Sequence, residues 1–354
     1  MAVVLGLLTM LPLLPANAWW VRIWDFPRPQ MFLVALILLP VVLSIRFSQR
    51  TLKMGAAALL LGVVLAQAWK VLPFTPLNTR EVQSSGRAES DRNITMLCSN
   101  VLMSNEESSE LAGQIETLKP SLVLLTECDE RWLEELRPVT ESYPYKVEKP
   151  LSNTYGMALY SQFELVEPEI KFLLEDDIPS IHSKLVLPSQ EMIKIYCLHP
   201  RPPAPQESDS TAQRDAELIL VAKETGKLNM PVIVMGDLND VAWSSTTSLF
   251  QSRSGLLDPR VGRGLYSTFH AQIPFLRFPL DHIFHSSHFR LAELRVEPDI
   301  GSDHFPIFVN LSLENSAPKL QPTPTPTPGT KENAEQIIKE GFQEELEEEE
   351  QGED

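Results

Sequence analysis

Polar side chains that bind metal or phosphate, or move protons, stand at the ends of several apolar segments of this sequence. Each segment has the composition of a β-strand, and the polar residue follows it, interrupts it or precedes it. The residues at these positions are Asn100, Glu127, His199, Asp237 with Asn239, Asp281, and Asp303 with His304. One such position is ordinarily a solvated strand end. Six of them in one block, with oxygen or imidazole ligands and no Lys or Arg, indicate strand ends that converge on one cleft.

These residue types suit the hydrolysis of a phosphate ester. Carboxylates such as Glu127 and Asp303 are hard oxygen donors that suit Mg²⁺ or Mn²⁺, and these ions also accept substrate phosphate oxygens. A bound metal ion would neutralise developing charge and help to generate hydroxide. We therefore expect a divalent cation as the cofactor of this cleft.

The other polar residues have the chemistry of water activation and charge stabilisation. Asp237 is suited to hold the attacking water, and the amide of Asn239 is suited to fix its geometry. His304 needs a carboxylate partner that sets its tautomer or stabilises its charge. Asp281 is the available partner in the sequence.

The block from residue 91 to 313 alternates apolar runs with helical stretches. Near-continuous apolar strands are typical of sheets that are covered on both faces. The last strand differs, because its apolar residues from Phe305 to Leu313 recur at every second position, which is the period of a half-buried strand. The expected strands lie at 93–100, 121–127, 192–199, 231–240, 280–285 and 305–313, and the expected helices at 108–120, 129–138 and 213–227. The block is therefore expected to form a mixed α/β domain.

The composition limits the classes of substrate. The chain has 354 residues, of which 43% are apolar, and this is ample for a core. Its formal net charge is −17, and residues 91–313 alone carry −13. A protein that grips long nucleic acid usually presents a basic face, so this charge disfavours a polynucleotide. The three cysteines show no CxxC spacing, and we expect buried thiols at Cys98 and Cys197.

Three apolar runs dominate residues 1–72, and we expect them to form about three transmembrane helices. The aromatic cluster "WWVRIWDF" favours a membrane interface. One alternative is a set of buried helices in a soluble protein. Another is that the first run is a cleaved signal peptide, although it lacks a basic n-region. The runs are "MAVVLGLLTMLPLLPANA", "MFLVALILLPVVLSI" and "MGAAALLLGVVLAQAW".

The segments around these runs predict where the domain lies. The loop "RFSQRTLK" has three basic residues and no acidic one, so we expect it to face the cytoplasm. The chain would then be a multi-pass cell-membrane protein whose main domain lies outside the cytoplasm. Residues 73–90 are polar and aperiodic, which predicts a flexible tether. Residues 314–354 combine a Pro/Thr-rich spacer with an acidic terminus, which predicts a tail that is disordered or weakly helical.

The segments "GDLND" and "SDHFPI", together with Glu127 and "LDHIF", resemble the endonuclease/exonuclease/phosphatase superfamily. This superfamily includes pancreatic deoxyribonuclease, abasic-site endonucleases, sphingomyelinases and inositol-polyphosphate phosphatases. The resemblance runs in order from Asn100 to His304, so it covers the block 91–313 and neither end of the chain. It implies a sandwich of two mixed β-sheets flanked by helices, with the site at one edge.

The resemblance also implies a role for each polar residue. Metal ligation would fall to Glu127, with support from Asn100 and Asp303. Asp237 and Asn239 would position or activate the nucleophile. His199 would contact phosphate or assist the leaving group. His304, held by Asp281, would stabilise the phosphoryl transition state.

Some residues near these motifs have two interpretations. Arg201, the only cation of the proline-rich loop after His199, lies either in a rigid surface loop or at the substrate. Phe269 either lines the pocket or packs in the core. No role is assigned to His270, His282, His285 and His288, which exceed what the motif requires.

Together these features predict a membrane-tethered, divalent-metal-dependent phosphoesterase that hydrolyses a phosphodiester or a phosphomonoester. A small or lipid-linked substrate is favoured, because the acidic domain repels polyanions and the tether keeps the site near a bilayer. One alternative is an endonuclease or exonuclease of the same fold that acts on DNA or RNA. The other is a non-catalytic binding domain.

Overall fold

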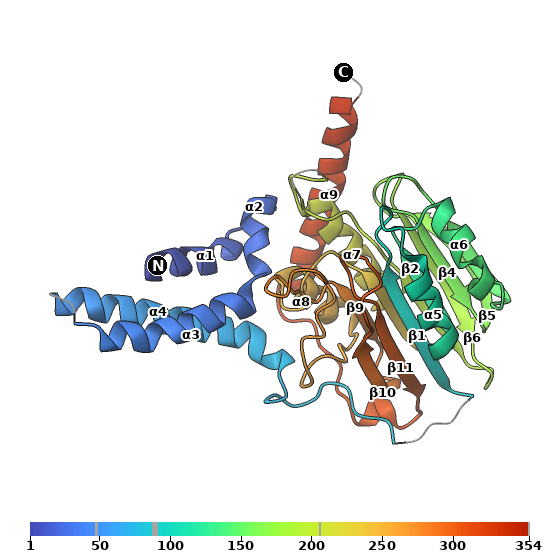
Figure 1. Ribbon diagram of the computed structural model, residues 1–354, viewed down its shortest axis with the longest axis horizontal. Helices are drawn as coiled ribbons and strands as arrows, with labels where there is room; N and C mark the ends of the chain where they lie inside the picture. The colour runs from blue at the N-terminus through green and yellow to red at the C-terminus, as the bar shows by residue number, and fades with distance from the viewer. Residues whose placement is uncertain (47–48, 87–90, 205–206, 353–354) are drawn as a thin grey trace.

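The computed structural model describes residues 1–46, 49–86, 91–204 and 207–352. Figure 1 follows the chain from the N-terminal helices, through two sheets, to a long C-terminal helix. The elements are α1 Ala2–Met10, η1 Leu11–Leu13, α2 Trp19–Arg22, η2 Ile23–Asp25, α3 Arg28–Ser44, α4 Arg50–Val71, η3 Leu72–Phe74, β1 Asn93–Asn100, α5 Ser108–Leu118, β2 Leu122–Thr126, α6 Glu130–Thr140, β3 Tyr145–Lys149, β4 Met157–Ser161, β5 Glu164–Phe172, β6 Pro179–Val186, β7 Met192–Cys197, α7 Ala212–Thr225, β8 Val232–Asp237, α8 Ser245–Ser254, β9 Asp281–His285, β10 Phe289–Val296, β11 Ile307–Leu313, η4 Ala317–Lys319 and α9 Thr330–Gly352.

Two mixed β-sheets form the centre of the domain that spans residues 91–313. The first has the strand order β10-β11-β1-β2-β4-β3, and the second has the order β5-β6-β7-β8-β9. Within these sheets β1 pairs with β2 in parallel and β7 pairs with β8 in parallel, while the other pairings are antiparallel. Each parallel pair is joined through a helix, because a parallel connection needs a crossover. The expected sandwich of two mixed sheets flanked by helices is confirmed.

The core between the sheets takes one face of each. It includes Met96 and Cys98 from β1 and Ile195 and Cys197 from β7, all of them buried. The buried thiols expected at Cys98 and Cys197 are confirmed, and both cysteines are free.

Helices cover the outer face of each sheet, so the central strands such as β2 and β8 are buried on both sides. On the first sheet, α5 and α6 contribute Ile115 and Trp132 to a second apolar cluster. This cluster also contains Phe308 of β11. The prediction that β11 is half-buried is therefore wrong, because the helices bury the second face of the strand as well.

The parallel pairs explain where the polar strand ends meet. Asn100 and Thr126 are register partners at the carboxyl ends of β1 and β2, and Glu127 follows Thr126. Strands β9 and β11 run antiparallel to β8 and β1, so they begin at the edge where β8 and β1 end. Asp237 is the register partner of Asp281. Six segments that are far apart in sequence therefore reach one edge of the sandwich.

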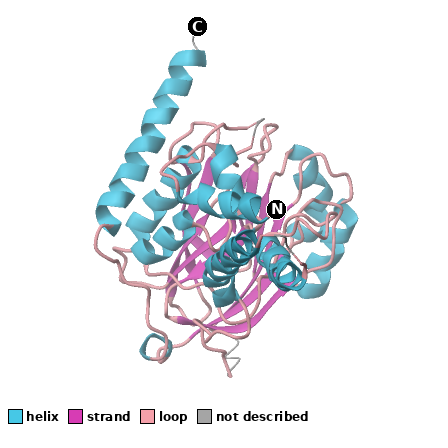
Figure 2. Ribbon diagram, turned by 90° about the vertical axis from the view of Figure 1, so that its left-hand side faces the viewer, coloured by secondary structure: helices cyan, strands magenta, loops and turns pink. Residues whose placement is uncertain are grey.

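The N-terminal apolar helices lie beside this domain. Helices α3 and α4 project from it side by side, and Figure 2 shows them end-on in front of the strands. The helix Arg50–Phe74 is long and apolar enough to cross a membrane, and Trp19–Asp25 with Arg28–Ser44, bent by 64°, would be a second span if the pair counts as one. These two features are weak evidence for membrane association, since core helices and signal sequences share them.

The expected number of about three spans differs from this finding. The described residues contain one helix, or up to two, that meets the criterion. The first apolar helix ends at Leu13, where Pro12 and Pro15 interrupt the run. Because an α-helix rises about 1.5 Å per residue and a bilayer core is about 30 Å thick, this helix is too short to span.

Helices α3 and α4 form a helical hairpin. Its base is anchored to the domain by aromatic packing and hydrogen bonds. Phe26 and Phe74 share an apolar cluster with Trp243. The indole Nε1 of Trp243 donates to the carbonyl of Asp25 at 2.7 Å. The backbone N–H of Thr211 donates to the carbonyl of Asn17 at 2.8 Å. The N-terminal segment is therefore packed on the loops that follow β7 and β8.

The structure differs from the flexible tether expected at 73–90. Residues 87–90 lie outside the described part, but the residues before them are packed on the domain. Val82 is fully buried in the core between the sheets. The backbone N–H of Ser85 donates to the carbonyl of Leu291 at 2.8 Å, and Leu291 N–H donates to the carbonyl of Gln83 at 3.0 Å. This segment extends the first sheet beyond β10.

The structure also differs from the disordered or weakly helical tail expected at 314–354. Helix α9 packs along α7, with Ala334 buried and Ile337 and Ile338 in the same apolar cluster. A Cβ at Gly341 would lie 2.3 Å from the Cβ of Ala216, so the two helices approach closely there. The apolar face of α9 explains the order, because it buries surface that a fully polar tail lacks.

Candidate active site

The amide of Asn100 joins carboxylates from the two sheets. Its Nδ2 donates to Glu127 Oε1 at 2.7 Å and to Asp237 Oδ2 at 3.0 Å. Its Oδ1 accepts from the backbone N–H of Leu102 at 3.0 Å, which fixes the orientation of the amide. The ends of β1, β2 and β8 are thus held together by one side chain.

The imidazole of His304 lies between two carboxylates. Its Nδ1 is 2.8 Å from Asp281 Oδ2, and its Nε2 is 3.4 Å from Asp237 Oδ2. The backbone N–H of His304 donates to Ser302 Oγ at 3.0 Å, and that hydroxyl donates to the carbonyl of Asn100 at 2.8 Å. Ser302 therefore ties the start of β11 to the end of β1 and positions the histidine.

His199 completes the group from the second sheet. Its Nε2 is 3.9 Å from Glu127 Oε1 and 3.9 Å from Asp237 Oδ2, which is beyond hydrogen-bond distance. Within the described residues its buried Nδ1 has no hydrogen-bond partner. The ring of Tyr155 lies against it, with 5.7 Å between ring centroids. This imidazole is buried but is not committed to a carboxylate.

The carboxylate of Asp303 stands apart from this network. The side chain is partly exposed, and its Oδ1 lies 3.5 Å from Ser302 Oγ. Among the described residues no hydrogen bond or ion pair joins it to Glu127. Its negative charge nevertheless raises the pKa of Glu127, so the two carboxylates face the same region.

The backbone at this edge adopts conformations that are rare for side-chain-bearing residues. Glu127 has φ 58° and Asn239 has φ 51°, both in the left-handed region. Such residues cost about 1–3 kcal/mol each and cluster at functional sites. Asn239 is held by two bonds, from its N–H to Asp237 Oδ1 at 3.0 Å and from its Nδ2 to the carbonyl of Pro200 at 2.9 Å.

Gly236 is required by the approach of β8 to the chain that follows β7. Its φ is 139°, and a Cβ there would lie 2.0 Å from the carbonyl oxygen of Leu198. No side chain fits that space. The glycine of "GDLND" therefore lets Asp237 and His199 sit side by side.

Burial is the main control on the charge state of Glu127, and neighbouring carboxylates add to its effect. Burial raises its pKa to about 7, the charges of Asp303 and Asp237 add to this, and the bond from Asn100 and the charge of His304 oppose it. A cation beside Glu127 would remove this penalty, since it favours the ionised carboxylate.

The pKa values of His304 and His199 are shifted in opposite directions. Although burial lowers it, the carboxylates of Asp237 and Asp281 raise the pKa of His304 to about 10. The pKa of Asp237 is lowered, because the two histidines outweigh its burial, whereas burial raises the pKa of Asp281. Burial also lowers the pKa of His199. His304 is therefore an imidazolium near neutral pH, and His199 is a neutral imidazole.

The donor set fits a divalent cation at Glu127. Its carboxylate is 18% exposed, and the charge of Asp303 acts on the same carboxylate, while Asn100 supports it through the bond from Nδ2 at 2.7 Å. Asp237, Asp281 and His304 form another group that could hold a metal ion, since their ligand atoms lie within 4.8 Å of one another. A protonated imidazole cannot ligate a metal, so this group is better described as an ion-paired triad.

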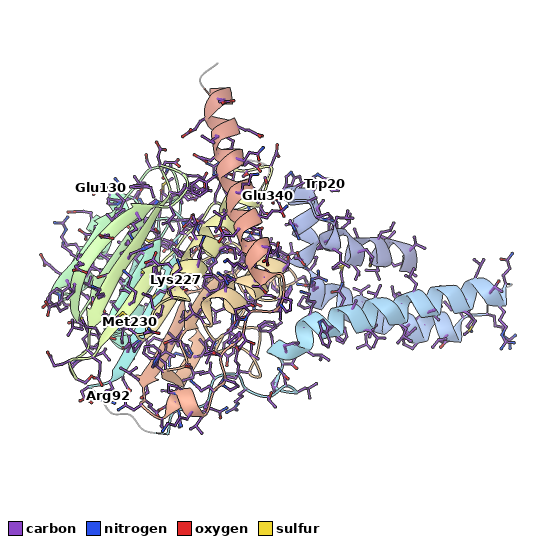
Figure 3. The ribbon with its side chains drawn as sticks, turned by 180° about the vertical axis from the view of Figure 1, so that it is seen from behind. Trp20, Arg92, Glu130, Lys227, Met230 and Glu340 are labelled. Carbon is purple, nitrogen blue, oxygen red and sulfur yellow. The ribbon has the colours of Figure 1, made fainter. Side chains whose placement is uncertain are left out.

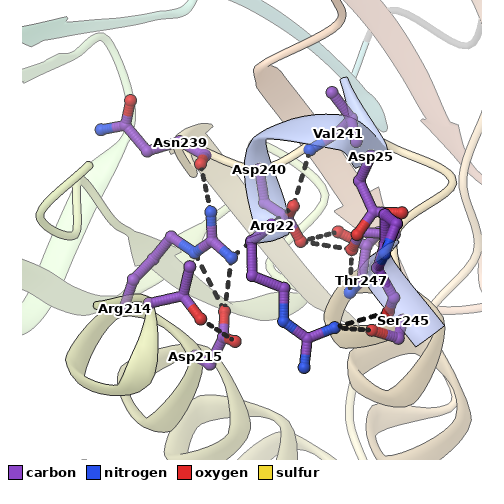
Figure 4. A network of polar contacts seen from close by, with 12 residues as sticks. Arg22, Asp25, Arg214, Asp215, Asn239, Asp240, Val241, Ser245 and Thr247 are labelled. Carbon is purple, nitrogen blue, oxygen red and sulfur yellow. Dashed lines mark hydrogen bonds and ion pairs between the residues drawn. The ribbon is translucent and has the colours of Figure 1, made fainter. Parts of the chain in front are cut away.

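A buried arginine supports the loop that carries Asn239, and the sequence alone did not single it out. Arg214 donates from Nη1 to the carbonyl of Asn239 at 2.7 Å and pairs with Asp215 at 2.6 Å. Figure 4 shows it next to Asp240 and the N-terminal residue Arg22. The signal was hidden because a charged residue on an amphipathic helix is usually solvated, whereas here α9 and the N-terminal segment cover α7.

His282, to which no role was assigned, is also structural. Its Nε2 lies 2.8 Å from the carbonyl of Asp240, and its Nδ1 lies 2.6 Å from Arg260 Nη2. Arg260 is paired with Asp258 at 2.8 Å. This buried chain fixes the position of Asp240 and, through it, the loop behind Asp237.

Comparisons with known proteins agree with this geometry. The family described as the Endonuclease/Exonuclease/phosphatase family matches residues 97–304, which is more than half of the chain and spans every residue of the site. No curated protein sequence matches the chain.

Solved structures with the same fold include bacterial and animal proteins. An endonuclease/exonuclease/phosphatase family protein from Bacteroides thetaiotaomicron has 19% identity and a TM-score of 0.53, covering 63% of this chain and 98% of that chain. D. rerio TDP2 complexed with a single-strand DNA product has 16% identity and a TM-score of 0.51, covering 63% of this chain and 100% of that chain. At these identities the likeness concerns the fold.

Proposed function

Because the chain belongs to the endonuclease/exonuclease/phosphatase family, whose members hydrolyse phosphate esters, we propose that it is a membrane-tethered hydrolase of a small or lipid-linked phosphoester. One observation carries the proposal: the imidazole of His304 is held between two carboxylates, with Nδ1 2.8 Å from Asp281 and Nε2 3.4 Å from Asp237, and these carboxylates raise its pKa. The neutral His199 and the carboxylate of Glu127 lie beside it. A positive group next to an acceptor for a water proton is what attack on a phosphate requires.

Each residue would act through its position in this network. Asp237 would orient the attacking water and accept its proton, since its lowered pKa keeps the carboxylate ionised and the backbone N–H of Asn239 fixes its other oxygen at 3.0 Å. The imidazolium of His304 would stabilise negative charge that develops on the phosphate oxygens. His199 would donate a hydrogen bond to a phosphate or leaving-group oxygen, because its ring is not committed to a carboxylate.

Glu127, with support from Asn100 and Asp303, would hold Mg²⁺ or Mn²⁺. When bound, such an ion would withdraw charge from the phosphate. This assignment rests on the oxygen donor set and on the raised pKa of Glu127.

The test is hydrolysis by the purified full chain in detergent. Bis(p-nitrophenyl) phosphate and p-nitrophenyl phosphate would separate diester from monoester activity. Asp237→Asn and His304→Ala should each lower kcat by about 10²-fold or more with little change in KM, because they remove interactions made in the transition state. Exposed Asp176→Asn is a matched control outside the site. Full activity in both site variants would overturn the proposal.

Membrane tethering is supported by the exposure of apolar side chains on the helical hairpin. Ile37 of α3 is 65% exposed, and Leu65 of α4 is 62% exposed. Figure 3 shows the side chains of these helices pointing outward, with Trp20 at the domain end. Trp is enriched where a helix leaves the bilayer. With "RFSQRTLK" in the cytoplasm, the domain would lie outside it, and a cysteine introduced at Arg80 should react with an impermeant reagent on intact cells.

A nuclease is the second candidate. One observation favours it, namely that D. rerio TDP2 with a single-strand DNA product shares the fold. The net charge of the domain opposes it. Values of kcat/KM for an oligonucleotide and a small diester at two ionic strengths separate the two, because a nucleic-acid enzyme would prefer the polymer and weaken steeply with salt.

A further inference from the structure

A short loop beside the active site presents apolar side chains to solvent. Residues 272–277, "QIPFLR", are all exposed. Phe275 is 84% exposed, and Ile273 and Leu276 are 40% and 47% exposed. Single exposed apolar residues are normal on a protein surface, but three together in one loop mark a contact surface. We call residues 272–277 the apolar rim.

The ends of the apolar rim contact the segment that precedes β11 and carries His304. The backbone N–H of Ala271 donates to the carbonyl of Asp303 at 2.7 Å, and the amide of Gln272 donates to the carbonyl of Ser302. The guanidinium of Arg277 lies 4.9 Å from the ring centroid of Phe305. The rim is therefore fixed next to the residues that flank His304.

The tip of the rim touches the first residues of α3. The amide Nε2 of Gln30 donates to the carbonyl of Phe275 at 3.0 Å. The turn is closed by bonds from His270 N–H to the carbonyl of Leu276 at 3.0 Å and from Leu276 N–H to the carbonyl of Ile273 at 3.0 Å. The backbone that carries the exposed apolar side chains is thus held in place and contacts the start of a candidate span.

A row of aromatic rings connects the catalytic histidine with the N-terminal segment. Phe269 lies 5.0 Å from His304, Phe278 lies 6.5 Å from Phe269, and Phe26 lies 5.5 Å from Phe278, measured between ring centroids. The base of the hairpin and the active site therefore share one packed unit. Figure 1 shows the loops before β9 next to the base of α3 and α4.

The N-terminal segment also exposes apolar side chains near the domain end of α4. Trp69 and Leu77, near the domain end of α4, are 81% and 87% exposed. If α4 crosses a bilayer, these side chains and the rim lie at the level of the interface, where aromatic residues collect. A loop with apolar side chains and one arginine suits that level, because the cation pairs with anionic headgroups.

We propose that the apolar rim inserts into the surface of the bilayer and that the substrate is a phosphoester whose apolar chain stays in the membrane. This inference rests on the proposed function and names its substrate class. The ester group would reach His304 past the rim, while the chain of the substrate remains among the lipids. The rim would not contribute to the binding of a water-soluble ester.

Insertion is tested with a fluorescent label in the full chain. The native Cys98, Cys128 and Cys197 are buried, so Phe275→Cys can be labelled selectively with an environment-sensitive dye. Met192→Cys is the control, because Met192 is 50% exposed and begins β7 at the end opposite the site. In nanodiscs of phosphatidylethanolamine and phosphatidylglycerol, nitroxide lipids should quench the dye at position 275 and not at 192. Equal quenching at the two positions, or none at 275, would overturn insertion.

The substrate class is tested with two diesters that differ only in chain length. Methyl p-nitrophenyl phosphate is soluble, and hexadecyl p-nitrophenyl phosphate partitions into the nanodisc. The wild-type chain should prefer the hexadecyl ester, and Phe275→Ser should lower kcat/KM for that ester by about tenfold, as expected when one phenyl ring no longer contributes to membrane binding. The same variant should leave the methyl ester unchanged, and Met192→Ser should change neither.

The outcomes separate the two proposals. A Phe275→Ser variant that loses activity equally on both esters, or on neither, would overturn the assignment of a membrane-borne substrate. Failure of the wild-type chain to hydrolyse either ester would overturn the proposed function, and with it the substrate class. The labelling result decides membrane insertion independently of activity.

Discussion

Substitution of Gly236 by alanine should damage both stability and activity, although Gly236 makes no chemical contribution of its own. A Cβ there would lie 2.0 Å from the carbonyl oxygen of Leu198. Ordinary contacts of a Cβ begin near 3.4 Å, so β8 and the segment after β7 must separate by roughly 1 Å or more. The segments that move carry Asp237 and His199.

The magnitude follows from two costs. Residues other than glycine rarely adopt a φ of 139°, and this conformation costs alanine about 1–3 kcal/mol. Overpacking of a tight contact costs a similar amount. About 4 kcal/mol of destabilisation lowers the Tm of a domain of this size by about 10 °C. A displacement near 1 Å between catalytic groups lowers kcat by about 10²-fold.

The assay compares Gly236→Ala with Gly113→Ala in the full chain. Gly113 lies inside α5 with nothing within 4 Å of an added Cβ. Alanine should stabilise that helix by up to about 1 kcal/mol, so the two variants should move Tm in opposite directions. A Gly236→Ala chain with wild-type Tm and wild-type kcat would refute the steric argument.

Four further results are expected. Asp281→Asn and His304→Ala should each lower kcat, and the double variant should be little worse than His304→Ala, whereas independent, multiplying losses would contradict the pairing of the two residues. Removal of divalent cations by a chelator should abolish hydrolysis, and Mg²⁺ or Mn²⁺ should restore it; full activity after exhaustive chelation would contradict a metal at Glu127. Because Glu127 has its pKa raised to about 7 and ligates only when ionised, Mn²⁺ affinity should fall about tenfold for each pH unit below that value. Because the pKa of His304 is raised to about 10 and the imidazolium is the active form, kcat at saturating Mn²⁺ should fall on the alkaline side only as pH rises through that value, and a fall as pH rises through 6.5 would contradict the ion pair.

The convergence of the candidate site residues could be predicted from the sequence because these residues stand at strand ends. In β1 and β8 the apolar run stops at Asn100 and Asp237, and the register of parallel strands then brings such ends together. The Asp281–His304 contact was also predictable from residue type. What the pattern does not give is distance: Asp303 neighbours His304 in sequence, yet its side chain stands outside the hydrogen-bonded group.

Edge elements were the least predictable from the sequence. Strand β5 contains Glu167 and Pro168 and is largely exposed, and β10, "FRLAELRV", carries its apolar residues at spacings that suit a helix as well as a strand. Their pairing partners are distant in the chain, so local pattern carries little of the information. Proline within β5 fits an edge strand, which needs no donor on its outer side.

Helix α9 has an apolar face that the acidic composition of the segment obscured. Ala334, Ile337, Ile338 and Gly341 recur at the spacing of one helical face. The many glutamates around them predicted a solvated tail, because strongly acidic segments usually lack enough apolar surface to fold. Here the apolar residues meet α7, and Glu335 pairs with Lys223 at 2.7 Å. A partner surface, which the local sequence cannot show, decides the outcome.

The packing of α9 has a consequence for the order in which the chain folds during synthesis. Its side chains hold both the N-terminal segment and the loop after β7, since Glu340 accepts from Asn17 at 3.0 Å and Glu344 accepts from Ser210 at 2.9 Å. The apolar N-terminal helices leave the ribosome before α9 does. At about 5–20 residues per second, the loop that carries Arg201 therefore waits through the synthesis of well over a hundred residues before Glu348 reaches it. A ribosome that stops before residue 330 would release a chain with the catalytic residues present and this loop unheld.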